Sequence, residues 1–357
     1  MKTAIIGLPM TGKTSLFTIL TGVHEAAHIG SMAVRIGVAQ VPDPRVEELA
    51  QVFSAPKTTH AVVEYVDTPA LSKEALRDPG VVASLRVVDA FAHVLRLFED
   101  PSVPHEAGSV DPLRDLEHAE LELILTDLMV IEKRMERLDK DRKKMKAPEL
   151  DREFEALERF KAALEANQPL RELELSEEEE KRTRGFQFLS QKPMLCVLNL
   201  GEADAARLHE IEAEYRNGPL AGRASTAVTA ICGKIEAELA ELSGDEAGEY
   251  LASYGLKESG LERLISATYS LLGLMSFLTA SEAEVRAWTI PKNSTAVKAA
   301  GTVHTDFEKK FIRAEVANWR VLADHGGYAG AREKGLLRLE GKDYIVREGD
   351  VLLIRHG

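Results

Sequence analysis

The sequence predicts an α/β protein with a mostly parallel sheet, an inserted pair of long helices and a separate α+β domain at the end of the chain. Three observations carry this prediction. Short apolar runs alternate with helix-like stretches over residues 1–100, two apolar stripes at helical spacing follow, and short strand-like runs broken by glycine turns occupy the region after residue 277.

The apolar runs of the α/β part have the length of buried strands. They cover residues 3–6, 62–66, 90–97, 193–199 and 227–232. Residues 15–20 predict the first helix, and residues 260–274 predict the helix that closes this part. Because strand-like runs lie on both sides of the helical stripes, the stripes are predicted to be an insertion within one nucleotide-type domain.

Both helical stripes repeat an apolar residue every three or four positions, which places these side chains on one helix face. The first stripe contains Leu121, Leu125, Leu128, Ile131, Met135 and Leu138, and the second contains Leu150, Phe154, Leu157, Phe160 and Leu164. Pro148 separates them and cannot continue a helix, so we expect an antiparallel hairpin. A further helix is expected to start at Ser176, because Glu179 completes a capping box there.

The last part of the chain predicts a small α+β domain. Its strand-like runs cover residues 285–290, 311–316, 336–339 and 351–355, and glycine turns separate them. The change of pattern after residue 277 marks the boundary with the preceding α/β part.

Charge and cysteine content exclude several classes of protein. The 357 residues carry 45 Lys and Arg against 58 Asp and Glu, a formal net charge of −13, so no overall field attracts the chain to DNA or to an anionic membrane. Cys196 and Cys232 lack the spacing of a zinc site or a disulfide framework. No apolar run approaches the roughly 20 residues of a membrane span. We expect a cytoplasmic protein without a membrane or DNA partner.

Residues 7–14, GLPMTGKT, match the phosphate-binding motif GxxxxGK[ST] between a predicted strand and a predicted helix. Backbone N–H groups of such a loop surround phosphates, Lys13 reaches the β- and γ-phosphates, and the Thr14 hydroxyl binds Mg²⁺. The alternative is a chance glycine-rich turn. The residues expected to contact a nucleotide are Gly7, Pro9, Met10, Thr11, Gly12, Lys13, Thr14 and Ser15.

Two polar residues follow other predicted strands. Asp67 ends the run 62–66, where a P-loop protein carries the carboxylate that holds Mg²⁺. Its alternative role is that of a surface residue capping a strand. Asn199 ends the run 193–199, and the segment 199–202, NLGE, occupies the place where GTPases carry their base-reading Asn-Lys-x-Asp motif.

The chain resembles the Obg-like ATPase (YchF) family of P-loop NTPases almost from end to end. The stretches that carry the resemblance are residues 7–14, 41–45, 108–112, 199–202, 235–239, 284–289, 304–308 and 339–344. The resemblance implies a G domain in two parts, residues 1–112 and 191–275. It further implies an inserted helical coiled-coil domain, 113–190, and a C-terminal TGS domain of β-grasp type, 276–357.

The resemblance also implies a preference for ATP over GTP. By similarity Asn199 and Leu200 contact adenine, and the loop at Cys232 and Gly233 closes the base pocket. Glu202 is one methylene longer than the Asp that accepts two N–H bonds from guanine, and Leu200 replaces the lysine that packs over that base. Both differences should weaken guanine recognition.

For hydrolysis, the family places a hydrophobic residue where Ras-like GTPases keep a water-orienting Gln, and Leu71 fits that pattern. The family's proposed catalytic histidine falls on His105, which would act with Lys13. The alternative is an incidental loop histidine. Counting back from Val41 places Ser31 at the position of the Mg²⁺-sensing threonine, so the expected metal ligands are Thr14, Asp67 and Ser31.

The second switch departs from the family pattern, because residues 67–70, DTPA, replace Asp-x-x-Gly. Pro69 stiffens the approach to the γ-phosphate and Ala70 replaces the glycine that meets it. We therefore expect an ATP-binding switch protein with Mg²⁺ as cofactor and slow hydrolysis of ATP to ADP and phosphate. The alternatives are a nucleotide-gated ribosome or RNA-binding module with little hydrolysis, and a GTPase.

The expected partner is a ribosome or RNA. The family associates with ribosomes, and its TGS domain is a suspected RNA-binding element. The predicted hairpin tip concentrates basic residues, namely Lys133, Arg134, Arg137, Lys140, Arg142, Lys143, Lys144 and Lys146. Their alternative role is that of solvated helix ends paired with Glu and Asp.

Overall fold

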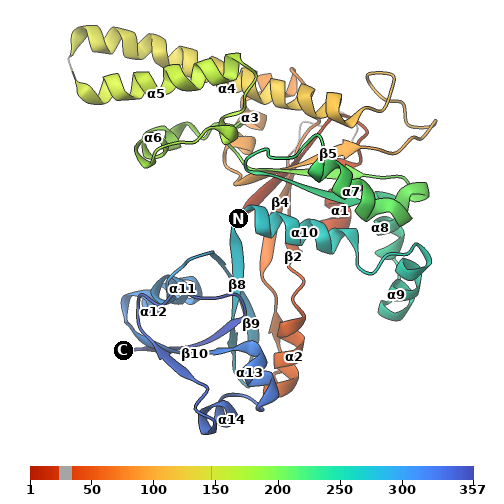
Figure 1. The fold of residues 1–357 in the computed structure, drawn as a ribbon, viewed down its shortest axis with the longest axis vertical. Helices are drawn as coiled ribbons and strands as arrows, with labels where there is room; N and C mark the ends of the chain where they lie inside the picture. The colour runs from red at the N-terminus through yellow and green to blue at the C-terminus, as the bar shows by residue number, and fades with distance from the viewer. Residues whose placement is uncertain (24–33, 146) are drawn as a thin grey trace. The chain divides into compact units, whose positions relative to one another are not determined.

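The computed structural model describes residues 1–23, 34–145 and 147–357. The chain forms two compact units (Figure 1). The first contains Met1–Val38 and Glu64–Leu271, and the second contains Ala39–Val63 and Leu272–Gly357.

The first unit is built on a six-stranded sheet of order β2-β4-β1-β5-β6-β7. Its strands are β1 (Lys2–Ile6), β2 (Arg35–Gln40), β4 (Val62–Asp67), β5 (Ala90–Arg96), β6 (Met194–Asn199) and β7 (Thr226–Ile231). The pairs β1–β4, β1–β5, β5–β6 and β6–β7 are parallel. The carboxyl ends of these strands therefore meet at one edge, where ligands bind in sheets of this kind. The five predicted strand runs are confirmed; β2 was missed.

Helices cover this sheet. They are α1 (Lys13–Thr21), α3 (Pro79–Arg86), α7 (Leu208–Asn217), α8 (Gly233–Leu239), α9 (Gly244–Ser253) and α10 (Gly260–Leu271), with short 3-10 turns η1 (Ala75–Arg77) and η4 (Glu202–Arg207). Helices α7 and α10 pack on β7, and α1 packs on β1. The buried core between them includes Phe91, Leu95, Leu198 and Ile235.

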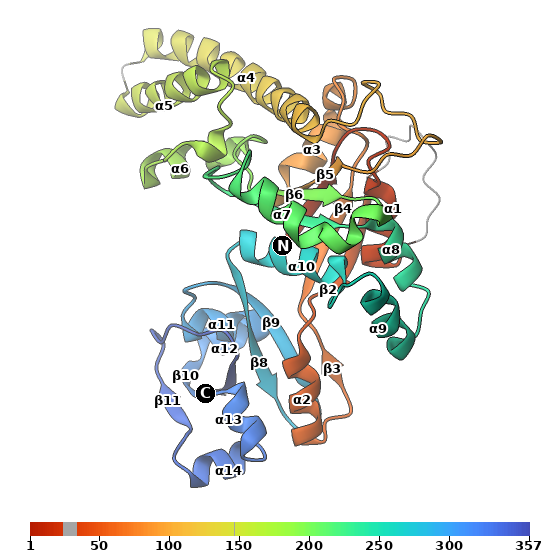
Figure 2. The ribbon, with the colours of Figure 1, turned by 45° about the vertical axis from the view of Figure 1, so that its right-hand side comes forward.

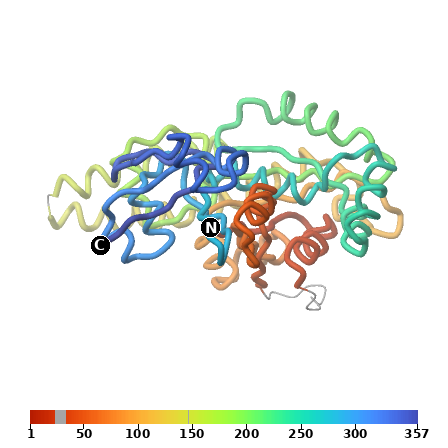
Figure 3. Tube along the Cα trace, turned by 90° about the horizontal axis from the view of Figure 1, so that it is seen from below, coloured from red at the N-terminus to blue at the C-terminus, as the bar shows by residue number. Residues whose placement is uncertain are grey.

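Helix α4 (Pro112–Lys144) and helix α5 (Pro148–Glu165) form the predicted antiparallel hairpin, the yellow-green pair of Figures 1 and 3. The Asp111 side chain accepts a hydrogen bond from Arg114 N at the start of α4. Pro112 follows at the first helical position, where the backbone N–H that proline lacks would have no partner within the helix. Ile131, Leu157 and Phe160 lie in the core of the hairpin. Helix α6 (Glu177–Thr183) starts with the predicted capping box of Ser176 and Glu179. The turns η2 (Leu170–Glu172) and η3 (Arg184–Phe186) flank it.

Asp127 anchors α4 to the segment that leads into β6. Its fully buried carboxylate accepts hydrogen bonds from Leu189 N at 2.9 Å and from Ser190 N at 2.7 Å. Burial raises the pKa of Asp127 from 3.8 to about 6, although both N–H bonds oppose the shift. The hairpin is thus connected to the sheet by a buried acceptor with two specific donors.

We expect Asp127→Ala to lower the free energy of unfolding by about 2–4 kcal/mol at pH 7, because it leaves two buried N–H groups without an acceptor. The folded state takes up the Asp127 proton at higher pH than the unfolded chain, so the gap between parent and variant should widen as the pH falls from 6 towards 4. Urea denaturation at both pH values measures this. Asp139→Ala, on the exposed side of α4, is the control; equal stability of both variants would contradict the prediction.

The second unit has a mixed sheet of order β11-β10-β12-β8-β9-β3. Its strands are β3 (Thr58–Thr59), β8 (Leu274–Ala280), β9 (Val285–Pro291), β10 (Phe311–Asn318), β11 (Arg338–Glu340) and β12 (Asp350–His356). Its helices are α2 (Pro44–Phe53), α11 (Ala296–Val303), α12 (Thr305–Lys309), α13 (Trp319–Asp324) and α14 (Tyr328–Glu333). The core includes Phe277, Ile290 and Val316. The four predicted C-terminal strand runs are confirmed.

Two features of the second unit differ from the sequence prediction. Residues 39–63 were assigned to the nucleotide-type domain, but they belong here because α2 packs on β8 and β9 and because β3 pairs with β9 (Figure 2). The run 260–274 was assigned wholly to a helix, but α10 ends at Leu271, before Gly273 at φ +62°, and β8 begins at Leu274. Strand pairing explains both observations, since β3 pairs with β9, and β8 pairs with β9 and β12.

Among the described residues, no helix is both long and apolar enough to cross a membrane.

Candidate functional site

The loop of residues 7–14 has the conformation that a phosphate-binding loop requires. It connects β1 to α1, and Gly7, Met10 and Gly12 have φ angles of +145°, +59° and +96°. A Cβ on Gly7 would lie 2.6 Å from the Val94 carbonyl oxygen, and one on Gly12 would lie 2.5 Å from Asn199 Nδ2. Glycine is therefore needed at both positions, for its φ angle and for its lack of a side chain.

Lys13 lies at the first turn of α1 and is 7% exposed. Its Nζ donates to the Leu8 carbonyl oxygen at 2.5 Å, across the mouth of the loop. Burial lowers the pKa of Lys13 to about 8, and the nearby Asp67 charge opposes this shift. The loop thus holds a buried lysine side chain that donates to the loop's own backbone, close to where phosphates would enter.

Thr14 and Asp67 meet beside this loop, as predicted for metal ligands. Because β1 and β4 run parallel with Ile5 opposite Asp67, both strands deliver their next residues to the same edge. Thr14 Oγ1 donates to Asp67 Oδ2 at 3.4 Å, and Arg35 forms an ion pair with the same oxygen. Within the described part of the chain, Asp67 Oδ1 is buried without a hydrogen-bond partner.

This donor set fits Mg²⁺, which takes hard oxygen ligands and binds through one or two side chains plus phosphates. The buried Asp67 Oδ1, left without a donor, is the observation that favours a cation here. Ser31, the third expected ligand, lies outside the described residues.

Asn199 connects three segments of the site. Its side chain is 6% exposed, its Nδ2 donates to the Thr11 carbonyl oxygen at 3.0 Å, and its Oδ1 accepts from Gly233 N at 3.0 Å. Since β6 and β7 are parallel with Asn199 opposite Ile231, the end of β6 lies beside the start of α8. The structure therefore brings the predicted residues Thr11, Asn199 and Gly233 together.

Leu200 and Cys232 were predicted to line the base pocket, but their side chains point into the core. Leu200 is 3% exposed and Cys232 is 1% exposed, and both pack in the apolar cluster beneath the sheet edge. Any contact of these two residues with a base would have to be made by the backbone.

Glu202, three residues after Asn199, begins the 3-10 turn η4, and its carboxylate already has two hydrogen-bond partners. Lys234 forms an ion pair with Glu202 Oε2, and Tyr254 Oη donates to Glu202 Oε1 at 3.3 Å. The Lys234 hydrogen bond and charge hold the pKa of Glu202 below its usual range. Each oxygen of the Glu202 carboxylate thus already accepts a hydrogen bond within the chain.

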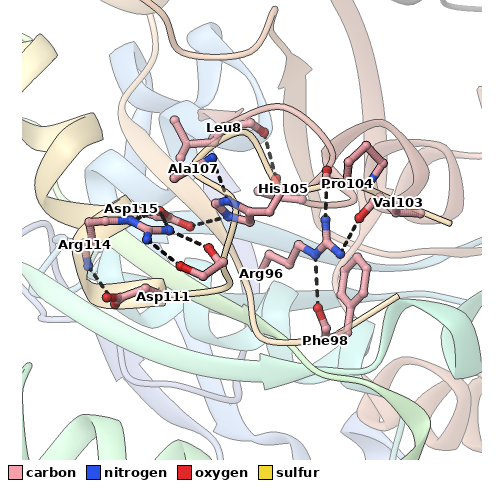
Figure 4. Close-up of polar contacts among 12 residues, drawn as sticks. Leu8, Arg96, Phe98, Val103, Pro104, His105, Ala107, Asp111, Arg114 and Asp115 are labelled. Atoms are coloured by element: carbon pink, nitrogen blue, oxygen red, sulfur yellow. Dashed lines mark hydrogen bonds and ion pairs between the residues drawn. The ribbon is translucent and has the colours of Figure 1, made fainter. Parts of the chain in front are cut away.

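Two aromatic residues near the base region were missed by sequence reasoning. Tyr254 reaches Glu202 from beyond α9, a position that no local motif marks. Phe98 lies against Gly201, where a Cβ would be 3.5 Å from Phe98 Cβ, and the Arg96 guanidinium lies 4.5 Å from the centre of the Phe98 ring. Arg96 also donates to the Phe98 and Val103 carbonyl oxygens, which fixes this loop (Figure 4).

His105, predicted to position water, is engaged by the start of α4. Its Nε2 lies 2.9 Å from Asp115 Oδ2, and its Nδ1 accepts from Ala107 N at 3.1 Å, as Figure 4 shows. Arg114 donates to the other oxygen of Asp115. Only 6% of the His105 side chain is exposed. Both ring nitrogens are therefore occupied, and a role in hydrolysis would require this loop to move.

The segment 67–71, which contains the second switch, is hydrogen-bonded both to β1 and to the phosphate-binding loop. Leu71 N donates to the Gly7 carbonyl oxygen at 3.0 Å, and Thr68 Oγ1 donates to the Ile5 carbonyl oxygen at 2.8 Å. Leu71 itself is 4% exposed. Leu71, which the family resemblance places at the position of the water-orienting Gln, is thus packed inward.

Comparison with known proteins assigns the family. A curated Bacillus subtilis protein named "Ribosome-binding ATPase YchF" is 40% identical and covers 99% of both chains, and its Escherichia coli O157:H7 counterpart is 38% identical over 98% of both. The chain belongs to the YchF family. The family model YchF-GTPase_C, described as "Protein of unknown function (DUF933)", matches residues 274–357.

A solved structure supports the same assignment. The structure titled "Structure of the Schizosaccharomyces pombe YchF GTPase" superposes with a TM-score of 0.85 at 27% identity, over 99% of this chain and 97% of that one. The YchF resemblance and the mixed α/β fold with two sheets and a helical insertion, both predicted from the sequence, are therefore confirmed.

Proposed function

We propose that this member of the YchF family is a ribosome-associated switch protein that binds ATP with Mg²⁺ and hydrolyses it slowly. The observation that supports this most directly is the loop of residues 7–14, with buried Lys13 beside the Thr14–Asp67 pair. The Bacillus subtilis and Escherichia coli relatives carry the name ribosome-binding ATPase.

Each residue of the site has a defined role in this proposal. Lys13 would exchange its bond to the Leu8 carbonyl for the β- and γ-phosphates and neutralise their charge. Thr14 and Asp67 would hold Mg²⁺, with Ser31 as the further expected ligand. The bound metal would stabilise charge that develops on the phosphates.

Hydrolysis is proposed to be slow for two reasons. Both nitrogens of His105 are occupied by Asp115 and Ala107, so no ring nitrogen is free to orient water. Pro69 has no N–H, and Ala70 lacks the freedom of the glycine that meets the γ-phosphate. The same observations favour a second candidate, a nucleotide-gated ribosome-binding module with little hydrolysis. Phosphate release by the purified chain, with and without ribosomes, separates the two.

Restoring glycine at the second switch should widen the difference between ATP and ADP. The affinities of the parent for ATP and for ADP are expected to differ by no more than a few-fold. A ligand shifts a conformation only through contacts that differ between the two states, and the altered second switch lacks the glycine that meets the γ-phosphate. The double variant Pro69→Ala, Ala70→Gly should bind ATP several-fold more tightly than ADP. Nucleotide titration measures both, with Ser72→Ala as the neighbouring control. Strong ATP-over-ADP discrimination by the parent would contradict this.

The preference for ATP over GTP is proposed to rest on Glu202. Guanine needs a carboxylate that accepts two N–H bonds, but each oxygen of Glu202 already accepts from Lys234 or Tyr254. Guanine would have to compete with these two donors for the position and the lone pairs of the carboxylate. Adenine places no such demand on Glu202.

Removing these partners should therefore favour GTP. We expect Lys234→Ala combined with Tyr254→Phe to reduce the ratio of ATP to GTP affinity several-fold. Competition titration with a fluorescent nucleotide measures the ratio, and Lys181→Ala on helix α6 is the charge-matched control. A ratio unchanged from that of the parent would mean that Glu202 does not select the base.

The hairpin tip is proposed to contact ribosomal RNA. Lys133, Arg137, Lys140, Lys143 and Lys144 are exposed, and no ion pair involves them within the described segments. Arg134 and Arg142 instead pair with Glu153 and Asp151 of α5. Within residues 133–144 of α4, these five cations stand beside three exposed acids, Glu136, Asp139 and Asp141. The C-terminal unit, expected to be a TGS domain, is the second proposed RNA contact.

A further inference from the structure

The first half of α4 exposes a stripe of apolar side chains. Leu121, Leu125 and Met129 are 40%, 42% and 71% exposed. They are spaced four residues apart, so they lie on one helix face, over about 12 Å of helix. The opposite face is already buried, because Leu116 and Leu123 lie in the core of the first unit. The exposed stripe is therefore not needed for packing within the described chain, and such stripes mark interaction sites.

A cavity of about 550 Å³ continues the stripe towards the nucleotide site. Its walls come from the phosphate-binding loop (Leu8), the segment that follows the second switch (71–74), the loop that follows His105 (106–107) and α4 (His118, Ala119, Leu121 and Glu122). Leu121 belongs to both the stripe and the cavity wall. A segment lying along the stripe would thus find a recess for a side chain at its end.

The charged side chains at the cavity end of this surface are mostly acidic. Glu74, Glu106 and Glu122 line the cavity, and Glu117 is exposed one turn before Leu121. Lys73 is the basic residue of the cavity wall. At the cavity end these four glutamates against Lys73 repel RNA phosphates and attract a cationic segment, while the exposed Lys133 lies one turn beyond Met129 at the other end of the stripe. This surface therefore differs in kind from the basic tip of the same hairpin.

We propose that Leu121, Leu125 and Met129, together with the adjoining cavity, bind a basic amphipathic helix of a protein partner. An apolar stripe repeating every four residues fits the stripe of a second helix, and acidic side chains beside it fit lysines and arginines. The inference rests on the proposed ribosome association: on the ribosome the partner at this surface is a protein, while the basic hairpin tip contacts RNA.

Site-specific crosslinking tests this directly. A benzophenone amino acid is placed at Leu125, and at Glu158 on the exposed side of α5 as control, in the full chain bound to purified ribosomes with ATP and Mg²⁺. After irradiation, we expect the Leu125 probe to give at least fivefold more adduct with ribosomal protein than the Glu158 probe. Adducts with RNA, or equal yields at both positions, would overturn the proposal.

A second measurement does not depend on the probe. Leu125→Gln with Met129→Gln should weaken ribosome co-sedimentation several-fold while ATP affinity stays within twofold of the parent, because these side chains are exposed and lie outside the phosphate-binding loop. Unchanged co-sedimentation overturns the proposal. If the parent chain itself fails to co-sediment with ribosomes, the proposed ribosome association is wrong and this inference falls with it. If the parent co-sediments but the crosslinking and the glutamine variants give the contradicting results, only this inference is wrong and the proposed function stands.

Discussion

Lys13→Ala is expected to weaken ATP binding about 100-fold. In the structure Lys13 has one hydrogen bond, to the Leu8 carbonyl oxygen, and is otherwise a buried cation at the mouth of the loop. Charge-assisted hydrogen bonds contribute about 1.5–3 kcal/mol each, and each 1.4 kcal/mol is a factor of ten in affinity. Losing contacts to two phosphates accounts for the expected effect.

Calorimetric titration with ATP and Mg²⁺ measures this change. Lys257→Ala, an exposed lysine remote from the phosphate-binding loop in the sequence, should bind ATP like the parent. Thermal denaturation without nucleotide should give similar melting temperatures for both variants, because Lys13→Ala removes a single internal hydrogen bond. Parent-like ATP affinity in the Lys13→Ala variant would show that the loop does not bind the phosphates.

Reversing the charge of the hairpin tip is expected to produce the second large effect. Lys140→Glu, Lys143→Glu and Lys144→Glu together should weaken ribosome binding at least about tenfold and flatten its salt dependence, since each lost phosphate contact removes about 0.9 from the slope of log affinity against log salt. All three side chains are exposed and unpaired in the described part of the hairpin. Lys146, which the sequence adds to this group, lies outside the described residues.

Co-sedimentation at several salt concentrations measures the affinity and the slope. The control carries three reversals elsewhere in the first unit, Lys181→Glu, Arg184→Glu and Lys257→Glu, all at exposed positions, so that its net charge matches. A control that loses as much affinity as the tip variant would assign the effect to net charge and contradict a specific RNA contact at the tip.

The sequence predicted best what is encoded locally. The loop of residues 7–14 needs glycine at positions where φ is positive, and Ser176 and Glu179 form their capping box within one turn. The hairpin followed from apolar spacing and Pro148 alone. Parallel strand order then accounts for the meeting of Asp67, Asn199 and the phosphate-binding loop at one sheet edge.

What the sequence could not predict depends on contacts between distant segments. Leu200 follows a strand end, and only the packed core shows that its side chain points inward. Tyr254 is 52 positions from Glu202, and strand β3 has two residues that are defined by pairing with β9. His105 could be recognised as a loop histidine, but its pairing with Asp115 requires the start of α4 in place.

Titration of the unmodified chain with ATP and with GTP, each with Mg²⁺, tests the central claim most directly. Lys13, Thr14 and Asp67 predict that a nucleoside triphosphate binds, and the occupied carboxylate of Glu202 predicts that ATP binds more tightly than GTP. Tighter binding of ATP, lost in the Lys13→Ala variant, is the expected result. Failure to bind ATP, or GTP binding as tight as or tighter than ATP binding, would contradict it.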